Sequence, residues 1–181
     1  MFGFEIKGLK VVALSDTHAR HRTLSVPACD VLVHAGDACN LGNKEQLKDF
    51  FDWYQAQPAR YKIFVAGNHD TLFETANQEL ENMIPKSVIY LENNLIEIEG
   101  VTFASIAARP KLKCFIEYEP IDVLVTHGAP FGIQDEERKG CKDLAKQILL
   151  IEPQYALFGH CHKGNKSPLR IGKTIYVNVT L

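Results

Sequence analysis

The sequence predicts an α/β protein with two packed mixed β-sheets flanked by helices. Short apolar runs recur along the chain, amphipathic segments stand between some of them, and residue pairs typical of tight turns become frequent in the second half. A first half that alternates strands and helices, followed by a second half rich in hairpins, is typical of such an arrangement. The chain of 181 residues fits a single domain, residues 1–181.

Five short apolar runs are the expected strands that lead to a functional site. They span residues 11–14, 31–33, 63–66, 123–125 and 156–158, and each leads into a polar block. Apolar runs of this length are typical of strands that are buried on both faces. Because α/β folds place their ligands at the carboxyl ends of strands, we expect the polar blocks to converge on one edge of a sheet.

Two amphipathic segments are the expected helices over the sheets. Asn43, with Gln46 three residues later, favours a helix start, and Pro58 ends this segment. A second segment begins at Cys141 and stops at Pro153. The apolar stripes are Leu47, Phe50, Phe51 and Tyr54 in the first segment, and Cys141, Leu144, Ala145, Ile148 and Leu149 in the second.

Turn pairs predict antiparallel hairpins in the second half of the chain. An Asn-Asn pair at 93–94 and a Glu-Gly pair at 99–100 separate short β-prone runs between residues 88 and 106. A Gly-Lys pair at 172–173 makes a similar turn near the end of the chain.

The polar blocks contain the residue types of a metal site. They are residues 15–18 (Ser-Asp-Thr-His), 36–37 (Gly-Asp), 67–70 (Gly-Asn-His-Asp), 126–128 (Thr-His-Gly) and 159–162 (Gly-His-Cys-His). In extended chain, side chains two apart point the same way, so Asp16 and His18 can face one ion, as can His160 and His162. Imidazole, carboxylate and amide ligands without thiolate suit Mn²⁺, iron or Zn²⁺ rather than Ca²⁺.

The order of the five blocks resembles the calcineurin-like metallophosphoesterase superfamily. The resemblance runs from residue 15 to residue 162, and the ordered set is far more specific than a lone Asp-x-His. Residues 30–37, 40–42 and 140–141 are also similar to small class III phosphodiesterases related to the metallophosphoesterase-domain (MPPED) proteins. The resemblance implies a four-layer α/β/β/α sandwich, in which two mixed β-sheets are flanked by helices.

The resemblance also implies two divalent metal ions that share one ligand. One ion would be held by Asp16, His18, Asp37 and His162, and the other by Asp37, Asn68, His127 and His160. Mn²⁺ is the expected ion, with iron or Zn²⁺ as alternatives. Two such cations lower the pKa of a shared water and clamp phosphate oxygens, so that the bridging hydroxide attacks in line.

His69 is the expected general acid. In the superfamily that the chain resembles, the histidine of the Gly-Asn-His block protonates the leaving alkoxide, and the following Asp70 would orient its ring or raise its pKa. The alternative for His69 is a structural role beside the metal ligands. His34, a lone histidine on an apolar run, is interpreted as a core residue.

Three further residues are candidates for contact with the substrate. The amide of Asn40 either donates a hydrogen bond to the phosphate or satisfies the turn backbone. His21 lies on the loop after His18, which is expected to pass over the metals, and contact or its absence are equal alternatives. Residues 105–119 are shorter than in the proteins that the chain resembles, which predicts an open, promiscuous site in which Arg109 supplies a phosphate contact.

The pattern as a whole predicts a metal-dependent hydrolase that acts on a small phosphoester. A phosphodiesterase, with cyclic nucleotides among the candidate substrates, is the preferred interpretation. Phosphomonoesters are the rival substrates, because the two reactions share one metal core and differ in the pocket walls. A non-catalytic metal-binding scaffold on the same fold is the other alternative. The presence of every expected ligand and of the expected acid favours an enzyme.

Composition and charge bear on other classes of protein. A formal net charge of -2 gives no general attraction to long nucleic acids. The 5 cysteines are an odd number without a Cys-x-x-Cys pair, which argues against a disulfide framework and a thiolate zinc site. Without a run as long as a membrane span or the pattern of a signal peptide, a cytoplasmic location is expected. The pattern carries no signal for an oligomeric state.

Overall fold

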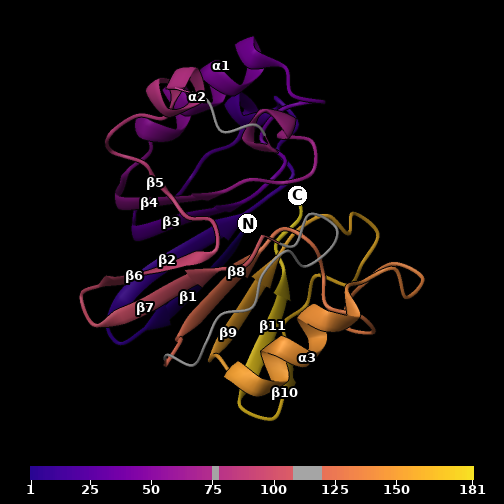
Figure 1. Cartoon of the computed structure of the whole chain (residues 1–181). Helices are drawn as coiled ribbons and strands as arrows, with labels where there is room; N and C mark the ends of the chain where they lie inside the picture. The colour runs from indigo at the N-terminus through magenta and orange to yellow at the C-terminus, as the bar shows by residue number, and fades with distance from the viewer. Residues whose placement is uncertain (75–77, 108–119) are drawn as a thin grey trace.

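The computed structural model describes residues 1–74, 78–107 and 120–181. Two β-sheets pack against each other, and helices cover their outer faces (Figure 1). The helices α1 (Lys44–Gln55) and α2 (Gln78–Met83) lie on the first sheet, and α3 (Lys142–Ile151) lies on the second. Short 3-10 helices, η1 (His21–Thr23) and η2 (Thr71–Glu74), stand in the loops of the first half. The predicted α/β/β/α sandwich is confirmed.

Each sheet is mixed, with parallel strands in the middle. The first contains β1 (Phe2–Ile6), β2 (Leu9–Leu14), β3 (Cys29–Ala35), β4 (Ala59–Val65) and β5 (Ile89–Tyr90) in this order, and only β1 runs antiparallel to its neighbour. The second contains β6 (Asn94–Ile98), β7 (Val101–Ser105), β8 (Val123–Thr126), β9 (Tyr155–Phe158), β10 (Leu169–Ile171) and β11 (Thr174–Asn178) in the order β10-β11-β9-β8-β7-β6. Its two edge strands, β6 and β10, are antiparallel to their neighbours.

Apolar side chains fill three layers between these elements. The central layer lies between the sheets and contains Val33, Phe103 and Leu157. The second layer joins α1 and α2 to the first sheet, and the third joins α3 to the second sheet. Full burial of a large apolar side chain stabilises a fold by about 1.5–3 kcal/mol, so these layers fix how the sheets meet.

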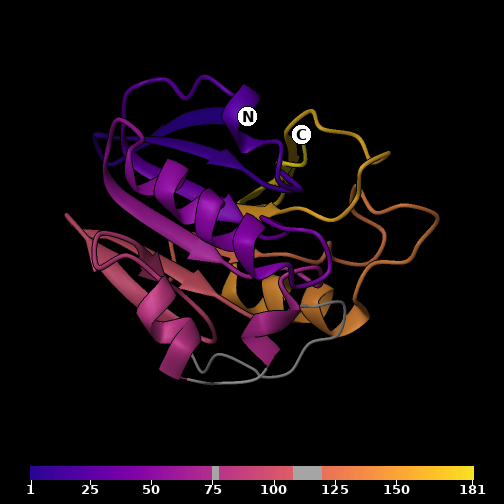
Figure 2. The same cartoon turned by 90° about the horizontal axis from the view of Figure 1, so that it is seen from above.

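The two predicted amphipathic helices are confirmed, and the first begins at its predicted cap. The side chain of Asn43 accepts a hydrogen bond from the backbone N–H of Gln46 at the start of α1, at 2.8 Å. Cys141 performs the same role for α3, with its sulfur 3.4 Å from the backbone nitrogen of Leu144. Figure 2 shows α1 from above, where it lies over the first sheet.

The five predicted strands are confirmed as β2, β3, β4, β8 and β9, but two expectations about their connections are wrong. These strands do not share one sheet, because β8 and β9 lie in the second. The turn at 93–94 is not a hairpin, since β5 pairs parallel with β4 and the chain then crosses to β6 in the other sheet. The hairpins at 99–100 and 172–173 are confirmed.

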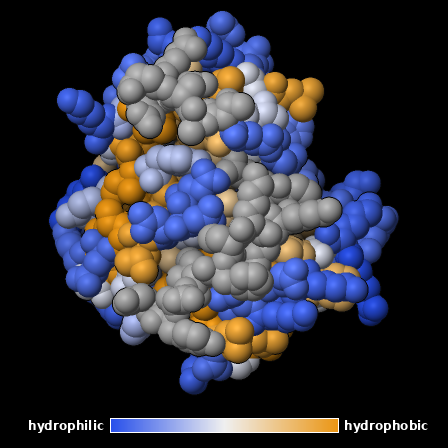
Figure 3. Space-filling view, viewed as in Figure 1, coloured by the Kyte–Doolittle hydropathy of each residue, from blue (hydrophilic) through white to orange (hydrophobic). Residues whose placement is uncertain are grey.

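Hydrophilic residues cover much of the surface drawn in colour in Figure 3. Hydrophobic residues gather toward the left of that view, where Figure 1 shows the edge strands β5 and β6. Ile89, Leu95 and Ile96 on these strands are only partly buried. None of the helices in the described ranges combines the length and the apolar character that crossing a bilayer requires.

Candidate metal centre and active site

The polar blocks meet where the carboxyl ends of the parallel strands of both sheets come together. The backbone N–H of Asp16 donates to the carbonyl of Gly36 at 2.8 Å, which joins the loops after β2 and β3. The backbone N–H of Ser15 donates to the carbonyl of Val179 at 3.1 Å, which joins the loop after β2 to the end of the second sheet. The site is therefore built from two sheet edges, rather than from the single edge that we expected.

Sharp turns, rather than strand alternation, orient the expected ligands. The strands β2 and β9 end before the polar blocks begin. Left-handed φ angles follow at Asp16 (58°), His18 (42°), Ala19 (61°), Asp37 (57°) and His160 (67°). Such a conformation costs a non-glycine residue about 1–2 kcal/mol, and clusters of strained residues occur where a fold holds functional groups in place. The extended-chain explanation is therefore wrong, although the side chains do come together.

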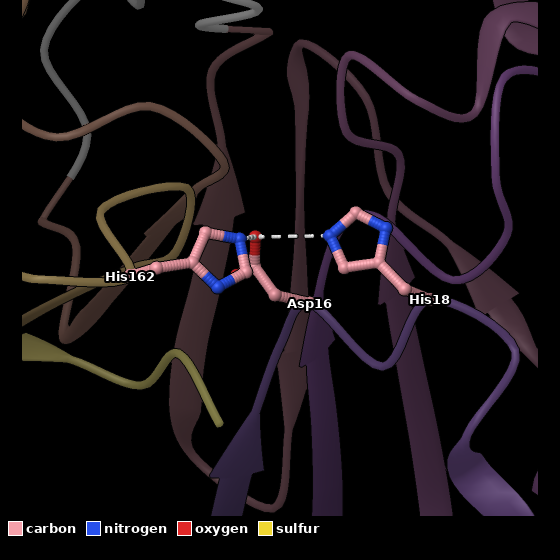
Figure 4. Close-up of side chains that lie close together, drawn as sticks. All are labelled: Asp16, His18 and His162. Carbon is pink, nitrogen blue, oxygen red and sulfur yellow. Dashed lines mark ion pairs between the residues drawn. The ribbon is translucent and has the colours of Figure 1, made fainter.

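The first group of potential ligands is Asp16, His18 and His162 (Figure 4). The Oδ1 atom of Asp16 lies 3.4 Å from Nε2 of His162 and 3.9 Å from Nε2 of His18. The other oxygen, Oδ2, accepts hydrogen bonds from the hydroxyl of Ser15 and from the backbone N–H of His160. Oδ1 is buried and has no hydrogen-bond partner among the described residues. An unpaired carboxylate oxygen between two imidazole nitrogens fits a bound cation.

Asp37 stands between this group and a second one. Its Oδ2 atom lies 3.7 Å from Nε2 of His18 and 3.3 Å from Nε2 of His127. Asp37, His127 and His160 present ligand atoms that all lie within 4.8 Å of one another. Oδ1 of Asn68 lies 2.9 Å from Nε2 of His127. The structure thus brings the seven expected ligands together, and their imidazole, carboxylate and amide donors fit two divalent first-row ions.

The pKa values of Asp37 and His127 in the second group favour an ion pair between them. Burial alone would raise the pKa of Asp37, but hydrogen bonding and attraction to His127 outweigh it and hold the pKa at about 2. Burial alone would lower the pKa of His127, but Asp37 raises it to about 9. The pKa of His160 is lowered by burial and by repulsion from His127. A cation at this position must therefore displace the proton of His127.

Two glycines allow the loops to approach the ligands closely. A Cβ on Gly36, which has a φ of 97°, would lie 2.5 Å from Nδ1 of His127 and 2.7 Å from the backbone nitrogen of Gly67. A Cβ on Gly67 would overlap Oδ1 and the backbone nitrogen of Asp37. Both positions exclude any larger residue without movement of a ligand.

His69 lies beside the expected metal ligands His18 and Asp37. Its backbone N–H donates to Oδ1 of Asp37 at 2.7 Å, and its ring stands edge-on to that of His18, with 4.8 Å between centroids. Its ring nitrogen also groups with ligand atoms of His18 and Asp37. The Nδ1 atom is buried and has no hydrogen-bond partner among the described residues. The hydrogen bond from its backbone, rather than one from its ring, therefore holds His69 in place.

The expectation that Asp70 orients His69 is wrong. The Asp70 carboxylate is fully buried and accepts backbone N–H groups instead, with Oδ2 bound to Asp37 and Gly67 at 2.8 Å each. Oδ1 accepts the N–H groups of Ala38 at 3.0 Å and Cys39 at 3.1 Å. Burial raises the pKa of Asp70, and the hydrogen bond from Gly67 opposes this rise. The carboxylate fixes the loop after β3 against the loop after β4.

His21 is buried beside α1, which favours the alternative in which it does not contact the substrate. Its side chain is fully buried beside α1, where its ring packs against Phe50 and Trp53 and its Nε2 lies 2.9 Å from Oδ2 of Asp49. Burial of this ring against the apolar surface of α1 is favoured over its exposure at the site. His21 therefore anchors the loop after β2 to a helix.

His34 occupies the core, as expected. Its ring is buried against Phe50 and Phe64, and burial lowers its pKa to about 3. Its Nε2 lies 3.1 Å from the hydroxyl of Thr17, which stands between two expected ligands. Thr17 thus faces the core on the helix side of the first sheet, and Cys161 is buried in the core beneath α3. No pattern in the sequence predicts the contact between Thr17 and His34.

Of the two remaining candidates for substrate contact, Asn40 lies among the described residues and Arg109 does not. Asn40 is exposed, and its side-chain nitrogen lies 3.5 Å from the carbonyl of His18, which places it on the rim of the site. Arg109 lies outside the described residues, as do most of residues 105–119. The hydroxyl of Ser15 donates a hydrogen bond to Oδ2 of Asp16, and the sequence analysis did not predict this contact. The only signal for it in the sequence is that Ser15 directly precedes an expected ligand.

Known proteins are similar in sequence to this one over nearly its whole length. A UPF0046 protein of Caenorhabditis elegans is 36% identical over 94% of this chain and 69% of the relative. Human metallophosphoesterase domain-containing protein 1 is 28% identical over 95% of this chain and 66% of its own length. The chain thus spans about two thirds of the length of these relatives.

Solved structures show the same fold. A phosphopantetheinyl hydrolase from Mycobacterium tuberculosis superposes with a TM-score of 0.66 and 16% identity, over 94% of this chain and 88% of that one. The profile of the calcineurin-like phosphoesterase superfamily domain matches residues 9–179. The profile match agrees with the order of the polar blocks. The chain belongs to the calcineurin-like phosphoesterase superfamily.

Proposed function

We propose that the protein is a dinuclear metal-dependent phosphodiesterase. Membership of the superfamily supports a phosphoester hydrolase. The observation that carries the dinuclear proposal is the position of the Asp37 carboxylate, whose Oδ2 atom stands 3.7 Å from His18 and 3.3 Å from His127. A shared carboxylate between two sets of imidazole ligands is what a pair of divalent cations requires.

The ligand set assigns a role to each side chain. Asp16, His18 and His162 with Asp37 would hold one cation, and Asn68, His127 and His160 with Asp37 the other. Two divalent cations, for which Mn²⁺ is our first choice, would supply a water activated for attack and a clamp for the phosphate oxygens. The chain itself supplies rigid loops that hold these ligands about the shared carboxylate.

His69 is proposed as the group that protonates the leaving oxygen. Its ring lies beside His18, and its backbone is tied to Asp37, so a phosphate between the two ligand groups would come within its reach. An alkoxide is a poor leaving group, and proton transfer from a positioned histidine contributes about 10²–10⁴-fold to such reactions. The contribution of His69 to the rate of hydrolysis should therefore increase as the leaving group becomes more basic.

The choice of diesters over monoesters rests on the resemblance of residues 30–37 and 40–42 to class III phosphodiesterases. Cyclic nucleotides are candidate substrates on the same ground. The first experiment is hydrolysis of bis(4-nitrophenyl) phosphate beside 4-nitrophenyl phosphate, with metal-stripped protein reloaded with Mn²⁺. Asp37→Ala removes the shared carboxylate, and Asp143→Ala, an exposed position on α3, is the matched control.

We expect metal-dependent cleavage of the diester that Asp37→Ala abolishes and Asp143→Ala preserves. Cleavage of the monoester alone would instead establish a phosphomonoesterase. A protein that binds the metal and cleaves neither ester under any loading would be a metal-binding scaffold, and the proposal would fail.

A further inference from the structure

Leu41 is an exposed leucine in a conformation that leucine seldom adopts. Its side chain is 78% exposed, the largest fraction among the exposed large apolar residues of the described chain. Its φ angle is 46°, in the left-handed region that favours glycine and asparagine. Neither packing within the chain nor backbone preference accounts for a leucine at this position.

The loop that carries Leu41 is fixed on both sides. The backbone N–H of Asn40 donates to the side-chain oxygen of Gln46 at 2.9 Å. The backbone N–H of Gly42 donates to the carbonyl of His69 at 2.7 Å. Hydrogen bonds on either side of a residue leave its backbone little freedom, so the side chain of Leu41 is presented to solvent from a rigid support.

This support belongs to the candidate active site. Gly42 is bound to the backbone of His69, and the side-chain amide of Asn40 lies 3.5 Å from the carbonyl of His18. The rings of His18 and His69 are 4.8 Å apart between centroids and lie next to Asp37. The residues on either side of Leu41 are therefore tied to the backbone of His69 and His18, which puts Leu41 on the rim of the site.

We propose that Leu41 packs against the apolar part of the substrate. The inference rests on the proposed function and deepens it, because it assigns a substrate class: phosphate esters with a flat apolar group, such as an aryl ring or a nucleobase. A preformed apolar side chain gains affinity when such a group covers it, since little ordering is needed on binding. Esters with only small polar groups would leave Leu41 in water.

Binding of two simple monoesters tests this contact. The affinities of phenyl phosphate and methyl phosphate for the Mn²⁺-loaded protein are measured by titration calorimetry, because the two ligands share the phosphate and differ in the apolar group. Leu41→Ala should lower the ratio of phenyl to methyl affinity about fivefold by removing apolar contact area. The affinity for methyl phosphate should stay unchanged.

Three further variants separate the contact from folding. Leu41→Gly relieves the left-handed backbone and should lose the preference for the phenyl group without loss of stability. Leu41→Met keeps an apolar side chain and should retain the preference. Leu149→Ala, at a 64% exposed leucine on α3, should change neither affinity.

An unchanged phenyl-to-methyl ratio in both Leu41→Ala and Leu41→Gly, or no preference for phenyl in the wild type, would overturn the proposal. Hydrolysis of bis(4-nitrophenyl) phosphate is measured on the same samples. A wild type that binds both ligands but cleaves no ester refutes the proposed function while the binding ratio still decides the role of Leu41.

Discussion

Asp70→Asn tests how the metal-binding loops are held in place. The substitution keeps the size of the side chain but turns one acceptor oxygen into an NH₂ group, which would face two backbone N–H donors. If Oδ2 is replaced, the bonds from Asp37 and Gly67 are lost, and if Oδ1 is replaced, those from Ala38 and Cys39 are lost. Either orientation breaks two hydrogen bonds to a charged acceptor.

The magnitude follows from these contacts. A hydrogen bond to a charged group contributes about 1.5–3 kcal/mol, so two of them are worth about 3–6 kcal/mol. The neutral amide avoids the cost of burying a charge, which is the cause that raises the pKa of Asp70, and this offsets part of the loss. We therefore expect Asp70→Asn to lower the free energy of unfolding by about 2–4 kcal/mol, which corresponds to roughly 4–16 °C in Tm for a domain of this size.

Thermal and urea unfolding of the metal-free protein measure this effect, because the absence of metal removes any contribution from altered ion binding. Asp143→Asn, at a side chain that is 61% exposed, is the matched control and should change stability by less than about 1 kcal/mol. An Asp70→Asn protein with wild-type unfolding midpoints and a shifted pH profile of hydrolysis would refute the loop-holding role. It would restore the interpretation in which Asp70 tunes His69.

Three other outcomes follow from the site. His69→Ala should keep the fold and the metals but slow turnover about tenfold or more, most for esters with basic leaving groups, and equal rates for all esters would remove its role as acid. Gly36→Ala should destabilise the protein by at least about 2 kcal/mol more than Gly100→Ala in urea unfolding, because only Gly36 has neighbours where the Cβ would lie. Metal binding at neutral pH should release a proton from His127, whose pKa is about 9, and calorimetry in buffers of different ionisation enthalpy should detect that release, whereas buffer-independent heats would contradict it.

The sequence was informative where short-range patterns have one structural outcome. Buried parallel strands carry continuous apolar runs, so β2, β3, β4, β8 and β9 could be predicted, and Asn43 marked the start of α1. The division of these strands between two sheets could not be predicted. It depends on whether the turn at 93–94 reverses the chain within one sheet or carries it across to the other, and both outcomes use the same turn residues.

Side-chain direction in the loops was the other limit. Asp70 follows His69 directly, which made a contact between their side chains plausible, but a carboxylate near several free backbone N–H groups satisfies those groups instead. His21 shows the same competition, because an aromatic surface on α1 lies within its reach and buries the ring. Such outcomes depend on neighbours that are distant in sequence, so local spacing does not determine them.

Hydrogen bonds within the chain hold the strained loops that carry the expected ligands. Six non-glycine residues of the loops after β2, β3 and β9 have left-handed φ angles, at a cost of about 1–2 kcal/mol each. The hydrogen bonds that oppose this cost come from within the chain, through the carboxylate of Asp70 and the backbone contacts between Asp16 and Gly36. These bonds hold the loops so that the carboxylate of Asp37 stands between His18 and His127. Rigid support of this kind lowers the cost of ordering a site when its ligand binds.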